Sequence, residues 1–143
     1  SFYFMQYKKF QNKIIFRLDR GEEVVESLKK ICNELGIKLG VVHGLGAVNK
    51  AVIGLFETET KKYLSREFSG DFEICPLYGN ITNMQGNIYL HCHVNLAGKD
   101  QKSFGGHLTS AKISATFEGV IDIFDGEIDR EYSNEIGLNL IKF

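Results

Sequence analysis

The chain has 143 residues, of which 43% are apolar, so it can bury one sizeable core without needing a disulfide or a structural metal. Basic side chains number 17 and acidic ones 18, for a formal net charge of −1. Neither sign forms a long block, which argues against a strongly basic nucleic-acid surface. The three cysteines lack CxxC spacing, which favours reduced thiols that fill the core of a cytoplasmic protein.

The opening segment SFYFMQYKKF has no apolar stretch of the length that a secretory signal needs. Nowhere in the sequence do 18 apolar residues run together, which argues against a membrane span. No low-complexity linker, repeat or boundary interrupts the chain. We therefore expect a cytoplasmic protein that has no membrane partner and forms a single domain over residues 1–143.

In chain order, the segment 13–18 reads as a strand, and a helix is expected over 22–35. Apolar residues of that helix fall on one stripe, with glutamate and lysine outside it: Val24, Val25, Leu28, Ile31, Cys32 and Leu35. Acidic residues in the first turn suit the positive end of the helix dipole. Gly36 stands where a left-handed cap favours glycine. The helix is therefore amphipathic, and its stripe should pack on a sheet.

Most of the remaining chain alternates in the way typical of strands, separated by glycine or charged turns. The expected strands are 38–48, 50–58, 62–68, 72–82, 87–97, 112–124 and 137–143. Parallel neighbours would need a helical crossover between successive strands, and only one good helix is present. The predicted fold class is α+β, a mostly antiparallel β-sheet with one main amphipathic helix packed on it.

Two of the four histidines form an HxH pair, His91 and His93, within the expected strand 87–97. Because successive strand side chains point to opposite faces, this pair shares one face with Asn95, while Cys92 and its apolar neighbours face the core. Two imidazoles at this spacing can converge on one ion about 2.0–2.1 Å from each nitrogen. The pair is therefore a candidate metal site.

A third histidine, His107, follows a polar loop and the glycines Gly105 and Gly106. We expect a turn there that doubles back beside the first strand, with the glycines allowing close backbone approach. Three histidines favour zinc, or another divalent transition metal, and leave one coordination position for water, substrate or a neighbouring subunit. Asp100 and Glu118 are the candidates for moving protons, and Asn95 and Ser103 could support the ligands.

Other interpretations remain beside this one. The histidines could be polar residues on a solvated strand face, and the Cys92 thiolate could ligate if the pleat were broken. His43 is expected to be a hydrogen-bonded structural residue. The segment GLGAVN lacks the third glycine of a dinucleotide fingerprint and has no following helix, so no organic cofactor is expected.

Three segments in order resemble the plants and prokaryotes conserved (PPC) domain: VVHGLGAVNKAVIGLF, then FSGDFEICPLYGNIT, then the stretch from GNIYLHCHVN to GVIDIF. The resemblance runs from about Lys13 to the tail, and it implies a mostly antiparallel sheet with a packed helix and a homotrimer. The prokaryotic branch resembles this chain in its HxH pair followed by GGHL. That resemblance implies metal ligation by the same histidines, His91, His93 and His107.

Plant members of the family contact DNA through a separate AT-hook, and no such arginine- and proline-rich arm occurs in this sequence. Direct nucleic-acid binding is therefore not expected, although the family name carries a DNA-binding label. The preferred hypothesis is a homotrimeric, zinc-binding PPC protein with a ligand-binding or regulatory role. The alternatives are a zinc-dependent enzyme that acts on a small molecule through a metal-bound water, and a DNA-associated regulatory protein.

Overall fold

The structure is a computed structural model that describes residues 5–143, so the first four residues of the domain expected over 1–143 lie outside it. Its secondary structure follows the chain as strands with one helix among them. The elements are β1 (Gln6–Phe10), β2 (Lys13–Asp19), α1 (Val24–Leu35), β3 (Gly40–Glu57), β4 (Lys62–Met84), β5 (Asn87–Ala97), β6 (Ser103–Ile123), β7 (Asp129–Ser133) and β8 (Leu138–Lys142).

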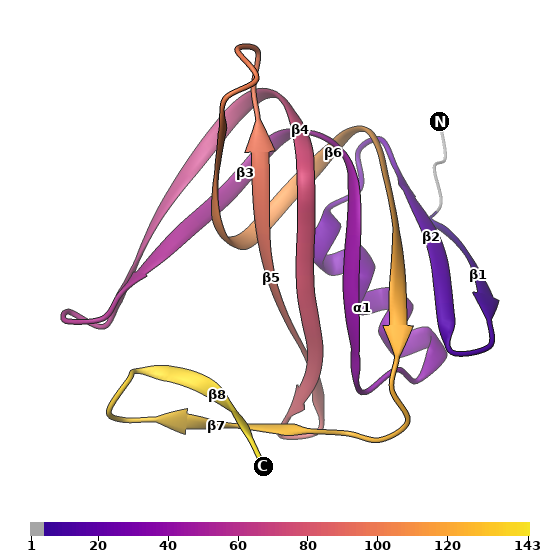
Figure 1. The fold of residues 1–143 in the computed structure, drawn as a ribbon, viewed down its shortest axis with the longest axis vertical. Coiled ribbons are helices and arrows are strands. Elements are labelled where there is room, and N and C mark those ends of the chain that lie inside the picture. The colour runs from indigo at the N-terminus through magenta and orange to yellow at the C-terminus, as the bar shows by residue number, and fades with distance from the viewer. Residues whose placement is uncertain (1–4) are drawn as a thin grey trace.

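Six strands form one sheet in the order β1-β2-β6-β3-β4-β5, and every pairing in it is antiparallel. The first residues of β6 also pair with β5, so β3, β4, β5 and β6 close into a ring. Strands β7 and β8 form a separate hairpin below the sheet (Figure 1). The predicted α+β class, with a mostly antiparallel sheet and one helix, is confirmed.

The helix α1 begins two residues later than the sequence predicted, because Glu23 acts as its N-cap. Glu23 has an extended backbone, and its carboxylate accepts hydrogen bonds from the N–H groups of Val25 and Glu26. At the other end, Gly36 adopts the left-handed conformation with φ 65°, as predicted. The helix packs against β5 and β6 through its apolar stripe, of which Leu28 and Ile31 are fully buried.

Strand β5 has the expected bounds, but several other strands are longer than predicted and several expected breaks are wrong. Most of 38–48 and of 50–58 belongs to the single strand β3, and 62–68 and 72–82 both belong to β4. Irregular pairing between Gly44 and Gly46 and between Val48 and Lys50 bends the ladder without ending it. The paired residues 50–57 of β3 and 62–69 of β4 form an arm that extends away from the rest of the sheet (Figure 1).

One hydrophobic core cluster runs between α1 and the sheet, and its largest members include Phe16, Phe117 and Leu77. Cys32 and Cys92 are buried in it as predicted, but Cys75 is exposed, so the prediction that all three cysteines fill the core is wrong for that residue. No helix in residues 5–143 is long and apolar enough to cross a membrane.

Candidate metal centre

Strand β5 presents His91 and His93 on the face opposite the core. Along this strand Cys92, Val94 and Leu96 are buried, whereas His93 is exposed and His91 half-buried. The alternation that the sequence predicted is therefore present. Antiparallel partners share a face, so the partner residues of β4 also line the surface that carries the two imidazoles.

The third imidazole comes from β6, where His107 pairs directly with His93. The expected turn that doubles back beside the first strand is found between Ala97 and Ser103, and Gly105, Gly106 and His107 lie in the strand that follows it. The expected close approach of the backbone is also found. A Cβ atom on Gly105 would come within 2.1 Å of the Val94 carbonyl oxygen, so only glycine fits there without displacement.

The three imidazoles lie together on one surface. The Nε2 atoms of His91 and His93 are 3.2 Å apart, and the ring of His107 lies 5.4 Å from the His91 ring and 5.8 Å from the His93 ring, measured between centroids. One nitrogen from each ring falls within 4.8 Å of the other two. The buried Nδ1 atom of His107 has no hydrogen-bond partner among the described residues. The donor set therefore fits one small cation.

Burial and the neighbouring charges favour the neutral forms of His91 and His107 by lowering their pKa values. Burial lowers the pKa of His91 to about 4, with further contributions from the positive charges of His93, His107 and Arg130. Burial, and then His93, also lowers the pKa of His107. A neutral imidazole has a lone pair available for a metal, whereas an imidazolium does not.

Two residues that the sequence analysis missed flank the cluster. Tyr63, from the arm, places its ring 5.1 Å from that of His107. Arg130, from β7, donates to the side chain of Asn80, which pairs with His91 across β4 and β5. The cluster is therefore bordered by the arm on one side and by the C-terminal hairpin on another.

Cys92 and His43 do not join the three histidines. Cys92 is buried in the core behind them, and burial raises the pKa of its thiol to about 12, so it stays protonated. His43 lies on β3 and stacks on Tyr78 at a centroid separation of 5.9 Å. His43 is therefore packed outside the cluster, but the hydrogen bond expected for its side chain is not found among residues 5–143.

The predicted proton-transfer and supporting residues lie elsewhere. Asp100 is in the turn between β5 and β6, where its carboxylate accepts the Lys102 N–H at 3.0 Å. Glu118 lies eleven positions after His107 on β6 and pairs with Arg17 and Leu45. Neither carboxylate belongs to the histidine cluster.

Asn95 and Ser103 lie on β5 and β6 beyond the histidines. Asn95 is exposed and pairs with Gly105, and Ser103 is exposed and pairs with Ala97 at the end of the hairpin. No hydrogen bond joins either side chain to the three imidazoles among the described residues. The structure therefore brings together the predicted ligands but not the predicted supporting groups.

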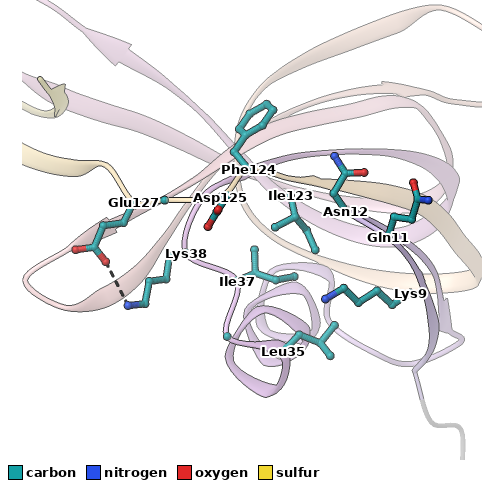
Figure 2. Close-up of a pocket in the computed structure, with 12 residues that line it drawn as sticks. Lys9, Gln11, Asn12, Leu35, Ile37, Lys38, Ile123, Phe124, Asp125 and Glu127 are labelled. Carbon is teal, nitrogen blue, oxygen red and sulfur yellow. Dashed lines mark ion pairs between the residues drawn. The ribbon is translucent and has the colours of Figure 1, made fainter.

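A separate cavity of about 500 Å³ lies at another part of the fold (Figure 2). It is lined by the end of α1, the turn between β1 and β2, and the end of β6. An ion pair of 3.3 Å between Lys38 and Glu127 borders it. No histidine lines this cavity, so it is distinct from the candidate metal centre.

A profile of the Plants and Prokaryotes Conserved (PCC) domain family matches residues 5–125. Since the match covers well over half of the chain, the protein belongs to this family, as the ordered segments of its sequence indicated. A search of curated proteins finds no match. Arg130 and the β7–β8 hairpin lie beyond the matched residues.

Solved structures with the same fold include three whose names bear on the site. A Bacteroides thetaiotaomicron protein, named as a supposed DNA-binding protein, has a TM-score of 0.95 and 34% identity over 97% of both chains. A metal-containing protein from Archaeoglobus fulgidus has a TM-score of 0.85 and 31% identity, over 100% of this chain and 99% of its own. A Pyrococcus horikoshii PPC protein has a TM-score of 0.85 and 26% identity, over 98% of this chain and 95% of its own.

Proposed function

We propose that this protein binds one divalent transition metal ion per chain, preferentially zinc, on His91, His93 and His107. The observation that carries the proposal is the convergence of three imidazole nitrogens within 4.8 Å, on one face of two paired strands. The Archaeoglobus fulgidus relative is named as a metal-containing protein, which supports the proposal. The role we assign is binding of a small ligand at that metal.

The spacing of the His91 and His93 donors fits zinc. Two nitrogens on one tetrahedral zinc, each 2.0–2.1 Å from the ion, lie about 3.3 Å apart. The Nε2 atoms of His91 and His93 are 3.2 Å apart. A hydrogen bond between two neutral rings would give a similar distance, so metal titration has to separate the two explanations.

A zinc ion held by the three histidines would keep one position open for a ligand and would polarise a ligand oxygen bound there. The side chains around the cluster would bind and orient the ligand. Tyr63 packs against the His107 ring, and Asn80 links the His91 strand pair to Arg130. This set of neighbours favours a ligand-binding role over an enzyme that needs a carboxylate to move protons.

We also propose that the chain assembles as a homotrimer. The family resemblance supplies the number of subunits, and the surface supplies a reason for assembly. Leu55 and Leu64 pair across the arm and are 66% and 53% exposed, and Leu45 on β3 is 64% exposed. Exposed aliphatic side chains of this kind favour a protein interface. Light scattering should give three times the mass of one chain, whereas a monomer would refute the assembly.

Direct DNA binding is not part of the proposal, despite the name of the Bacteroides thetaiotaomicron relative. The chain has a net charge of −1, and a protein that neutralises many phosphates needs a basic surface. We expect no binding to duplex DNA at low salt in a titration. Affinity that is high at low salt and falls steeply as salt rises would overturn this expectation.

Cobalt(II) titration tests the metal site, because its visible absorption reports a low-coordinate nitrogen site. We expect saturation at one cobalt per chain in the wild type and loss of the bands in His107→Ala. His43→Ala is the matched control, since His43 lies outside the cluster and should leave the titration unchanged. Equal titrations for the wild type and His107→Ala would refute the proposal.

A further inference from the structure

Arg130 is an almost buried cation that is held rigidly beside the histidine cluster. The residue is 9% exposed. Its Nε donates to Thr82 Oγ1 at 2.8 Å, its Nη1 to the Asn139 carbonyl oxygen at 2.9 Å and its Nη2 to Asn80 Oδ1 at 2.7 Å. The guanidinium also lies 4.5 Å from the centre of the Tyr89 ring. These contacts fix the plane of the guanidinium.

Strand register places this guanidinium on the same face as the proposed metal. Asn80 pairs with His91 and Thr82 pairs with Tyr89 across β4 and β5. Paired residues share a face of an antiparallel sheet. The two side chains that accept from Arg130 therefore lie on the same face as His91: Asn80 is directly opposite it, and Thr82 is two residues further along β4. Arg130 therefore lies next to the ligand that is nearest to the hairpin.

The guanidinium has no counter-charge of its own. Among residues 5–143, no carboxylate forms an ion pair with Arg130, and all three acceptors of its hydrogen bonds are uncharged. Buried cations are ordinarily paired with an acidic group. A guanidinium has five N–H donors, of which three are used here, so two remain for a further acceptor.

Positive charge accumulates when a divalent metal is added to this surface. An imidazole that binds a metal does so in its neutral form, so the three histidines would not offset the charge of the ion. Arg130 adds one more positive charge, and no acid belongs to the cluster. An anion that reaches both the open position of the metal and the two unused donors would offset that charge. A planar fork of this kind matches a carboxylate in particular.

We propose that the ligand of the metal site is a small molecule with a carboxylate group, which Arg130 recognises while the metal on His91, His93 and His107 binds an oxygen of the same molecule. This inference rests on the proposed metal site and adds the chemical class of its ligand. Arg130 lies beyond the residues matched by the family profile, so the selectivity belongs to the C-terminal hairpin.

The hairpin is fixed where this role requires it. Lys61, at the tip of the arm, donates from Nζ to the Asn134 carbonyl oxygen at 2.6 Å, and its aliphatic carbons lie against Gly137. The turn between β7 and β8 is therefore tied to the arm that carries Tyr63. Arm and hairpin together hold Arg130 over its rung of the sheet.

The test uses the cobalt-loaded protein, with acetate as the probe and phosphate as the comparison. We expect acetate to change the visible absorption of the wild type in a saturable way, with phosphate binding more weakly. Arg130→Met should bind cobalt as the wild type does but lose about tenfold or more in acetate affinity, because a charged hydrogen-bond donor is removed. Arg17→Met is the matched control and should behave as the wild type, since Arg17 pairs with Asp19 away from the site.

Arg130→Lys guards against a variant that fails to fold, because it keeps the positive charge but not the fork. We expect it to bind cobalt normally and to bind acetate more weakly than the wild type. Unchanged acetate affinity in both Arg130 variants, or tighter binding of phosphate than of acetate, would overturn the carboxylate assignment and leave the metal site intact. Failure of the wild type to bind cobalt would instead overturn the proposed function.

Discussion

The Nδ1 atom of His107 is buried and has no hydrogen-bond partner among residues 5–143. A buried polar atom left in this state costs about 1–3 kcal/mol of stability. Two further imidazoles lie 5.4 and 5.8 Å from its ring, between centroids, and one nitrogen of each ring lies within 4.8 Å of the other two. We therefore expect a cation bound by the three rings to offset this cost.

At the same scale, acidification should destabilise the metal-free protein. The pKa of His91 is about 4 in the folded chain against 6.5 for a free histidine, and that of His107 is lowered in the same direction. Between those values the unfolded chain binds a proton that folded His91 does not, so the free energy of unfolding falls as pH falls from about 6.5 towards 4. Urea unfolding at pH 7.5, 6.5 and 5.5 measures the slope.

His91→Gln should reduce that slope, because glutamine does not titrate. We expect the variant to lose less stability than the wild type between pH 7.5 and pH 5.5. An identical pH dependence in both proteins would mean that His91 is not the group responsible.

The placement of His91 and His93 could be predicted from the sequence, because strand alternation depends only on neighbouring residues. The position of Asn80 close to His91 could also have been predicted from the sequence. The two-residue turn Gln85–Gly86, with positive φ at both positions, fixes the register of β4 and β5 and sets Asn80 opposite His91. The position of Arg130 could not be predicted from the sequence, because a separate hairpin brings it to the site from far along the chain.

Among the elements, the helix depends on an unusual cap. The Glu23 carboxylate accepts from the N–H groups of Val25 and Glu26, and also from that of Ala111 on β6, each at 2.9 Å. One side chain thus caps the helix and joins it to the sheet. Glutamate is longer than the usual capping residues, which is why a start at residue 22 was predicted instead.

Glu23→Ala should therefore lower the free energy of unfolding by about 2 kcal/mol, because a cap is lost and a backbone donor of β6 is left unsatisfied. Urea denaturation at pH 7.5 measures the change. Glu26→Ala is the control, because the Glu26 side chain is 76% exposed and its ion pair with Lys29 is long at 4.0 Å. Equal losses in the two variants would refute the role of Glu23 as a link between helix and sheet.

The glycines before His107 hold β6 close to its neighbours. A Cβ atom on Gly106 would lie 2.6 Å from the Gly54 carbonyl oxygen and 3.1 Å from Ile53 Cγ2. Gly106→Ala should displace the strand, weaken metal affinity about tenfold and cost about 1–3 kcal/mol of stability. Isothermal titration with zinc and urea unfolding measure the two effects.

Gly98→Ala is the matched control in the adjoining turn, where the nearest atoms to a new Cβ are ring carbons of Phe72 at 3.5 and 3.6 Å. We expect unchanged zinc affinity for this variant. If Gly106→Ala bound zinc as tightly as Gly98→Ala, the claim that close packing of β6 at Gly106 positions His107 would be wrong.

The expected breaks within β3 and β4 show the limit of pattern reading. Glycine and charged residues near position 49 and position 70 ordinarily mark turns. Here they sit at a bulge in β3 and at a residue with φ 131° in β4, where the two long strands bend together and stay paired. A local signal cannot tell a bend from an end, because the difference lies in whether the partner strand continues.

For the whole molecule, we expect the core and the proposed metal site to be separate sources of stability. The core cluster lies between α1 and the sheet, whereas the imidazoles face outward, so the metal-free chain should remain folded. Zinc at about 100 times its Kd should add about 2.7 kcal/mol, which corresponds to a rise in Tm of roughly 8 °C. Thermal denaturation with zinc and after chelation measures the shift.

The same melting experiment on His107→Ala should show no rise with zinc, while His43→Ala should show the rise of the wild type. Unfolding of the wild type on chelation would contradict the separation, because the metal would then be required for the fold itself.

Elemental analysis of the purified protein tests the central claim most directly, with the wild type beside His91→Ala and His107→Ala. The account predicts nearly one zinc, or one other divalent transition metal ion, per wild-type chain and loss of that metal from both variants, while each variant stays folded. Metal-free wild-type protein that also takes up no zinc when it is supplied, or variants that keep the full metal content, would contradict it.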